Sequence, residues 1–153
     1  MLVLFLDQPL QEDMHNSVYT KTWVASLVPQ SSYESNYQLR GAGWGFVRNI
    51  LFANFHVKGA DSGPAITEDS GNNGSYSGTG LVGVSNIAFV NFTGYLNDTS
   101  ITASVRCSKV HPCYNTEFED VDLTVSVSST STRVGKCAYI EASGVHGITG
   151  SGC

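Results

Sequence analysis

A short residue pattern recurs three times along this chain of 153 residues. Each copy has an asparagine, a phenylalanine three positions later, a second polar residue five positions later, and then an apolar residue. The copies begin at Asn49, Asn86 and Asn115, so the intervals between them are 37 and 29 residues. Self-similarity with a period of about 20–50 residues is typical of a solenoid, in which each repeat packs only on its neighbours.

The segments that carry the repeat have the hydrophobic pattern of β-strands. Residues 47–57, 84–93 and 114–123 alternate between apolar and polar side chains with a period of about two. No segment sustains apolar residues at helical spacing, which excludes the helical ankyrin, TPR and HEAT repeats. We therefore predict an all-β chain folded as a parallel β-helix, with asparagine ladders at its turns. A β-sandwich, with a strand at every 8–12 residues or so, is the alternative.

The repeat also predicts where the chain departs from a regular coil. We expect residues 71–80, which are rich in glycine, asparagine and serine, to form an inserted loop that lengthens the first interval. At roughly 20–40 residues for each coil, the chain holds about four to six coils. A solenoid needs capped ends, and we expect a loop closed by Cys137 and Cys153 over Ile140 and Val145 to cap the C-terminus.

The four cysteines are interpreted as a disulfide framework. Four cysteines allow three pairings, and local pairing is the simplest because both loops are short. The expected disulfides are Cys107–Cys113 and Cys137–Cys153. A zinc site is the alternative, but the five residues between Cys107 and Cys113, with His111 among them, do not match the usual ligand spacing.

The composition excludes several functional classes. The chain has 8 Lys plus Arg against 13 Asp plus Glu and a net charge of −5, so it is not basic enough for a nucleic-acid-binding protein. Its longest apolar run, residues 1–6, is too short to span a bilayer. We expect a monomeric extracellular protein that needs no cofactor or metal and that binds neither nucleic acid nor membranes.

Three N-glycosylation sequons, at Asn73, Asn91 and Asn97, indicate export. The apolar start is a poor secretory signal, because no basic residue precedes it and no small-residue cleavage site follows it. An exported protein without a signal peptide leads us to expect that the start of the chain is missing.

Several segments carry a family resemblance through their order and spacing. They are Lys21-Thr22-Trp23, Gly41-Ala42-Gly43-Trp44-Gly45 leading into Val47-Arg48-Asn49-Ile50-Leu51-Phe52, Pro64-Ala65-Ile66, Ser85-Asn86-Ile87-Ala88-Phe89, and Cys107-Ser108 followed by Pro112-Cys113. Over residues 10–153 the chain resembles the C-terminal part of glycoside hydrolase family 28, the polygalacturonases and related pectinases, and most closely the fungal exopolygalacturonase type. The resemblance implies a right-handed parallel β-helix, N-terminally truncated, with residues 1–153 as the C-terminal section of a single pectinase-type domain.

The resemblance implies inverting hydrolysis of α-1,4-linked galacturonate in pectin, by one protonated Asp and carboxylates that activate a water. In the family these groups belong to an N-T-D motif and a D-D pair, and a G-H-G motif adds a histidine. In the region before the expected substrate-binding segment, Asp7 and Asp13 are lone carboxylates without the context of an N-T-D motif or a D-D pair. We therefore assign no catalytic residue and expect the chain to be inactive alone. A non-catalytic β-helical fragment that binds pectin or serves a structural role is the alternative.

The resemblance also implies substrate binding by Lys21 and Tyr19. The family's R-I-K segment, whose Arg and Lys bind a galacturonate carboxylate, corresponds to residues 19–21. Lys21 keeps the ammonium group that pairs with the anionic sugar. Tyr19 stands at the Arg position, which removes a bidentate donor, although a tyrosine could stack on a sugar ring.

Other residues with chemical potential are interpreted as structural. We expect His146 in a turn of the C-terminal cap and His56 as an outward polar residue of a strand. Glu68 and Asp69 are neighbours on a strand and point to opposite faces, so they do not form a catalytic pair. Four aromatic residues either line a sugar cleft or stack in the solenoid wall: Trp23, Trp44, Tyr33 and Tyr37.

Overall fold

The computed structural model describes residues 3–5, 8–12, 15–23, 25, 28–29, 39–40, 43–70, 78–97, 101–125, 134–141 and 144–153. Within these ranges the regular structure is β-strand throughout. Accordingly, none of the described residues belongs to a helix that is long and apolar enough to cross a membrane.

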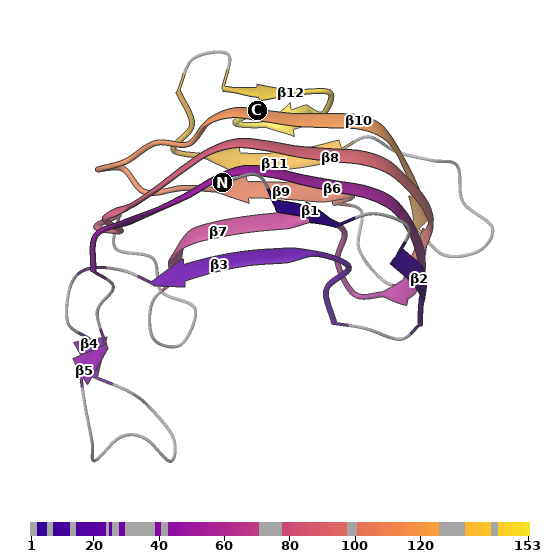
Figure 1. The fold of residues 1–153 in the computed structure, drawn as a ribbon, viewed down its shortest axis with the longest axis horizontal. Helices are drawn as coiled ribbons and strands as arrows, with labels where there is room; N and C mark the ends of the chain where they lie inside the picture. The colour runs from indigo at the N-terminus through magenta and orange to yellow at the C-terminus, as the bar shows by residue number, and fades with distance from the viewer. Residues whose placement is uncertain are drawn as a thin grey trace.

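The strands form two parallel sheets and one short antiparallel pair (Figure 1). The long-strand sheet contains, in spatial order, β1 (Val3–Phe5), β6 (Gly45–Ala60), β8 (Val82–Leu96), β10 (Tyr114–Val125) and β12 (Val145–His146), and β2 (Gln8–Glu12) also pairs with β6. The short-strand sheet contains, in spatial order, β3 (Tyr19–Trp23), β7 (Ala65–Ser70), β9 (Ala103–Arg106), β11 (Val134–Ala138) and β13 (Thr149–Ser151). The antiparallel pair is β4 (Val28–Pro29) with β5 (Leu39–Arg40).

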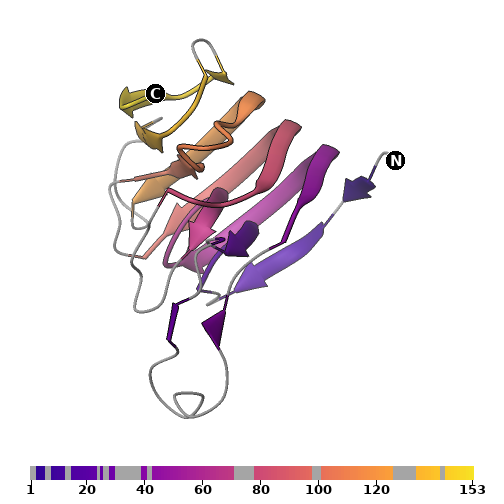
Figure 2. The same cartoon turned by 90° about the vertical axis from the view of Figure 1, so that its left-hand side faces the viewer.

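Successive coils of the chain each contribute one layer to both sheets. The coils are β1–β2–β3, β6–β7, β8–β9, β10–β11 and β12–β13. They stack so that the two termini lie at opposite ends of the molecule (Figure 2). Because every pairing between coils is parallel, the chain is a parallel β-helix, as the repeat predicts, and a β-sandwich of antiparallel strands is excluded.

The repeated residues of successive coils lie opposite one another in the long-strand sheet. Phe52 is opposite Phe89, and Phe89 is opposite Phe118. Their rings are stacked, with centroids 5.3 Å apart in the first pair and 4.9 Å apart in the second. The same offset aligns Phe55 with Phe92, whose rings are 4.7 Å apart. These rings lie in the hydrophobic core, so the unequal sequence intervals are absorbed outside the long strands.

The repeated asparagines form a ladder along the stack. Asn86 Nδ2 donates to Asn49 Oδ1 at 3.0 Å, and Asn115 Nδ2 donates to Asn86 Oδ1 at 2.7 Å. All three adopt left-handed backbone conformations, with φ between 52° and 59°. We expected these residues in turns, but they lie inside the long strands, where a left-handed residue bends the chain without ending the pairing. Asparagine tolerates this conformation better than other residues with a side chain.

Both expected disulfides are present. Cys107–Cys113 closes the connection between β9 and β10, and Cys137–Cys153 ties β11 to the C-terminal residue. Ile140 and Val145, which lie within the loop closed by the second disulfide, are half-buried and pack against the core. This agrees with the expected C-terminal cap. The expected loop at 71–80 lies between β7 and β8, but its residues 71–77 are outside the described part of the chain.

Candidate functional site

The short-strand sheet has one face in the core and one face toward the outside. Ile66 of β7 and Val105 of β9 are in register and fully buried. Their sequence neighbours therefore point outward, since side chains alternate along a strand. Lys21, Thr67 and Arg106 occupy one outward column across β3, β7 and β9.

The outer face of β3 places the two expected substrate-binding residues together. Tyr19 and Lys21 are separated by one residue and lie on the same side of the strand, as does Trp23. The Lys21 Nζ atom is 5.0 Å from the centroid of the Trp23 ring and 5.9 Å from that of Tyr19. Both distances are within the range of a cation–π interaction. The two rings thus hold the ammonium group in place on the outside of the solenoid.

A cleft of about 350 Å³ lies beside this column, on the outer face of β7, β9 and β11. Its lining includes Thr67 and Ser104, which supply hydroxyl groups, and two cationic side chains, Arg106 and Lys136. Sequence reasoning missed both cations, because strands of four and five residues carry too little pattern to be aligned by eye. The register reveals them, since Lys136 of β11 is opposite Ser104 of β9.

Described acidic side chains are concentrated on the long-strand sheet. The long strand β10 exposes four acidic residues, Glu117, Glu119, Asp120 and Asp122. On the outer face of the short-strand sheet, the described side chains include three cations and no carboxylate. The side chain of Asp69 is not among those described. Among the described side chains, this face thus carries more positive than negative charge, although the chain is acidic overall.

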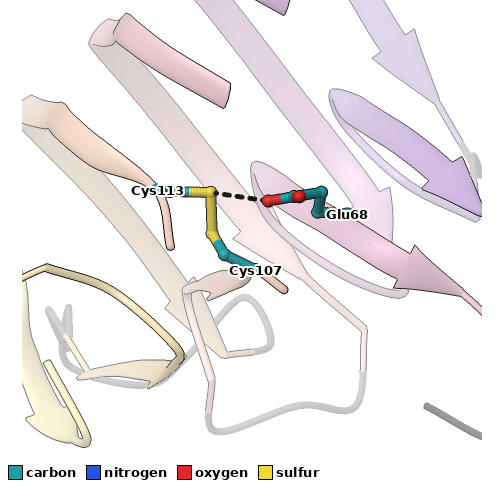
Figure 3. A group of neighbouring side chains, drawn as sticks. All are labelled: Glu68, Cys107 and Cys113. Atoms are coloured by element: carbon teal, nitrogen blue, oxygen red, sulfur yellow. Dashed lines mark hydrogen bonds between the residues drawn. A yellow bond between two sulfur atoms is a disulfide. The ribbon is translucent and has the colours of Figure 1, made fainter. Parts of the chain in front are cut away.

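Glu68 points the other way, into the interior. Its side chain is 0% exposed, and its Oε2 atom accepts a hydrogen bond from the Ser108 backbone N–H at 3.2 Å. Figure 3 shows the carboxylate directed at the disulfide, with Oε2 3.5 Å from Cys113 Sγ. The two cysteine sulfurs are bonded to each other, so neither is a thiolate ligand and the three residues do not form a zinc site.

The other described residues considered from sequence are not among those that line the cleft. His146 is an exposed residue of β12, and it is opposite Glu117. His56 is exposed on β6, where its Nδ1 atom lies 3.1 Å from Thr93 Oγ1, in agreement with an outward polar position. Trp44 is 76% exposed, so it does not stack in the solenoid wall. Four further residues, Asp7, Asp13, Tyr33 and Tyr37, are outside the described part.

Two of the three sequon asparagines make hydrogen bonds between coils. Asn91 Nδ2 donates to Asn54 Oδ1 at 2.8 Å, and Asn97 Nδ2 donates to the Gly59 carbonyl oxygen. Both side chains are exposed, while Asn73 is outside the described residues. Glycosylation at these positions stays a prediction. A glycan on Asn91 would be attached to the Nδ2 atom that donates the hydrogen bond to Asn54 of the neighbouring coil.

Comparisons with known proteins give one family and a small set of relatives. Residues 37–146 match the family described as glycosyl hydrolases family 28. The chain is 59% identical over 140 residues to a Neosartorya fischeri protein provisionally named galacturan 1,4-alpha-galacturonidase C, and 54% identical to the Aspergillus niger protein of the same name. Each alignment covers 91% of this chain and 33% of the relative.

A more distant relative carries a different activity in its name. Alpha-L-rhamnosidase rgxB of Aspergillus niger is 26% identical over 146 residues, which cover 93% of this chain and 32% of that protein. The chain thus spans about a third of the length of the curated relatives that it matches. No solved structure matches it significantly.

Proposed function

The chain belongs to glycosyl hydrolase family 28, and from that premise we propose that it is the C-terminal portion of a secreted polygalacturonase-type enzyme acting on the α-1,4-galacturonosyl linkages of pectin. The names of the two more similar relatives support a galacturonan substrate. The two disulfides support an oxidising, extracellular environment. The protein would act as a monomer.

The observation that carries this proposal is the position of Lys21. Its ammonium group lies against Trp23 and Tyr19 on the outer face of β3, in the segment to which the family resemblance assigns substrate binding. A fixed ammonium can form a charge-assisted hydrogen bond with the carboxylate of a galacturonate unit. Tyr19, 41% exposed, offers the same sugar an aromatic face.

We further propose that the 153 residues do not hydrolyse pectin by themselves. Inverting hydrolysis needs a general acid and a general base on opposite sides of the scissile bond. The sequence contains no N-T-D motif, no D-D pair and no G-H-G motif. The chain would then contribute substrate binding, while carboxylates beyond these residues would carry out the reaction, which requires no cofactor.

A binding assay and an activity assay on the purified chain test this proposal. We expect calorimetry to detect binding of trigalacturonate and no reducing ends to be released from polygalacturonate. Lys21→Ala should weaken binding about tenfold, which corresponds to one charge-assisted contact, while Lys109→Ala on an exposed loop should not change it. Hydrolysis that survives Lys21→Ala would contradict both the inactivity and the role of Lys21.

The second candidate function is a non-catalytic pectin-binding or structural module. The cation-lined cleft favours it, because this surface is present and its described lining contains no carboxylate. Binding without turnover is expected under both functions for the isolated chain. They differ in whether the complete parent protein hydrolyses polygalacturonate, which the coding sequence upstream of Met1 can reveal through the catalytic motifs.

A further inference from the structure

The two disulfides lie in different environments. Cys107 and Cys113 are both fully buried. Cys137 is 7% exposed, whereas its partner Cys153 is an exposed residue. Thiol–disulfide exchange requires an attacking thiolate to reach one of the two sulfurs, so its rate depends on access. Of the two disulfides, Cys137–Cys153 is therefore the one that is open to a thiol from solvent.

The buried disulfide is also held by its surroundings. The Cys107 N–H donates to the Ala138 carbonyl oxygen and the Glu141 N–H donates to the Cys113 carbonyl oxygen, so the next coil covers this connection. The Glu68 carboxylate adds a chemical barrier, because its Oε2 atom lies 3.5 Å from Cys113 Sγ (Figure 3). A thiolate formed beside a buried carboxylate is disfavoured by like-charge repulsion.

The exposed disulfide fastens the last coil of the stack. β12 and β13 are the final strands of the two described sheets, at the C-terminal end of the solenoid (Figure 2). The first pairs with β10 over two residues, and the second pairs with β11 over three. Ile148, which lies between them, is buried in the core. A coil with so few backbone pairs depends strongly on its cross-link.

This coil also borders the cleft. β11 contributes Lys136 and Cys137 to the lining of the cleft, and β13 contributes Ser151. Lys136 and Ser151 are opposite each other in the pairing of these strands. The Cys153 sulfur packs closely on β11, since a Cβ added at Gly135 would lie 3.1 Å from it. Loss of the disulfide would therefore free a strand that forms one border of the cleft.

We propose that Cys137–Cys153 is a redox-sensitive latch. A small dithiol in solution reduces it while Cys107–Cys113 stays intact, and the reduced chain releases β13 from β11 and opens the cleft at this border. The latch goes beyond the proposed function and does not depend on which ligand the cleft binds, so its failure would leave that function untouched.

The exchange proceeds in two steps. A thiolate of the dithiol attacks Cys153 Sγ and forms a mixed disulfide, while the Cys137 sulfur leaves as a thiolate and takes up a proton. The second thiol of the dithiol then attacks the reagent's own sulfur in the mixed disulfide, and Cys153 leaves and is protonated. The protein disulfide gains two electrons and two protons, and the dithiol is oxidised to a cyclic disulfide.

Differential alkylation of the native chain tests the selectivity. The 153-residue protein is incubated with dithiothreitol, quenched with iodoacetamide at successive times and mapped by peptide mass spectrometry. We expect Cys137 and Cys153 to be alkylated at least about tenfold faster than Cys107 and Cys113, because access sets the rate. In urea above the unfolding midpoint, the two pairs should react at similar rates. Equal rates in the native chain, earlier alkylation of the buried pair, or no reaction of either pair would overturn the latch.

Hydrogen exchange of the selectively reduced chain tests the release of the coil. The amides of β13 should exchange at least about tenfold faster than in the oxidised chain, whereas those of β9 should keep their protection. Reoxidation with glutathione disulfide should restore the protection of β13. If β13 stays protected after reduction, the disulfide is labile but holds nothing closed, and the latch is wrong. Protection that does not return on reoxidation would also contradict a reversible latch.

A double variant supplies the matched control. Cys137→Ser, Cys153→Ser lacks the latch and keeps the buried disulfide, so its β13 amides should exchange as fast as those of the reduced wild type. Dithiothreitol should not change this rate further. A dithiothreitol response in the double variant as large as in the wild type would place the redox-sensitive group elsewhere and overturn the proposal. The wild-type measurements require no substitution, so they decide the question even if the double variant does not fold.

Discussion

At the residue scale, an asparagine in the left-handed conformation allows a strand to bend while it stays paired with its neighbouring strands. Asn86 donates to Asn49 and accepts from Asn115 while its own φ is 53°. Alanine would lose both hydrogen bonds and strain the backbone, because a left-handed residue with a Cβ costs about 1–2 kcal/mol. Glycine would lose the hydrogen bonds alone.

Asn86→Ala should therefore lower the free energy of unfolding by about 2 kcal/mol or more, and Asn86→Gly by less. Urea denaturation followed by circular dichroism measures both. Glu119→Gln, at an exposed position of β10, serves as the control and should stay within about 0.5 kcal/mol of the wild type. Glycine more destabilising than alanine would contradict the argument from backbone strain.

Individual residues also show how far sequence alone can go. The asparagines were predictable because the same residue returns at every coil, and Lys21 was predictable through the family resemblance. Arg106 and Lys136 were not predictable, because they line the same cleft only through the pairing of β9 with β11, and these strands are separated in sequence by β10. Glu68 could be placed facing away from Asp69 by strand alternation, but not beside a disulfide that comes some 40 residues later.

At the element scale, the β9–β10 connection is anchored on β7 through a buried carboxylate. Glu68 accepts from the Ser108 N–H within a region where Cys107 and Cys113 are fully buried. Glu68→Ala would remove this acceptor and leave a cavity, so we expect a loss of about 2–4 kcal/mol in unfolding free energy. Glu68→Gln keeps a side-chain oxygen at this position and should cost less. Thermal unfolding of the two variants, compared at equal pH, measures the difference.

The C-terminal disulfide acts on a different element. Cys137–Cys153 closes a loop with a sequence separation of 16 residues and holds β13 against β11. Replacing both cysteines by serine should cost about 3 kcal/mol by loop entropy. Hydrogen exchange should then speed up in β13 first and leave β8 protected, because a coil contacts only its neighbours. Equal loss of protection in β8 and β13 would show that the cap stabilises the stack as one unit.

At the scale of the whole molecule, an acidic chain presents a cationic face. The net charge is −5, yet Lys21, Arg106 and Lys136 share the outer face of the short-strand sheet, while the acidic side chains of β10 belong to the other sheet. Each coil contributes one strand to each sheet, and the outer faces of the two sheets point in different directions. The cations of one sheet and the acidic residues of β10 can therefore lie on different faces of the molecule. A sequence-wide charge count averages over these directions, so it hides the face on which an anionic polymer can bind.

This arrangement predicts a specific dependence on salt. Between about 20 mM and 500 mM NaCl the Debye length falls several-fold, so attraction between exposed charges is screened. Hexagalacturonate binding should therefore weaken several-fold across this range. The double variant Arg106→Gln, Lys136→Gln should bind more weakly at low salt and lose less of its remaining affinity as salt rises, because two of the three attractive charges are gone. The double variant Arg48→Gln, Lys58→Gln carries the same net charge and should keep the wild-type salt dependence. If both double variants respond to salt alike, net charge and not the cationic face governs the binding of the acidic sugar chain.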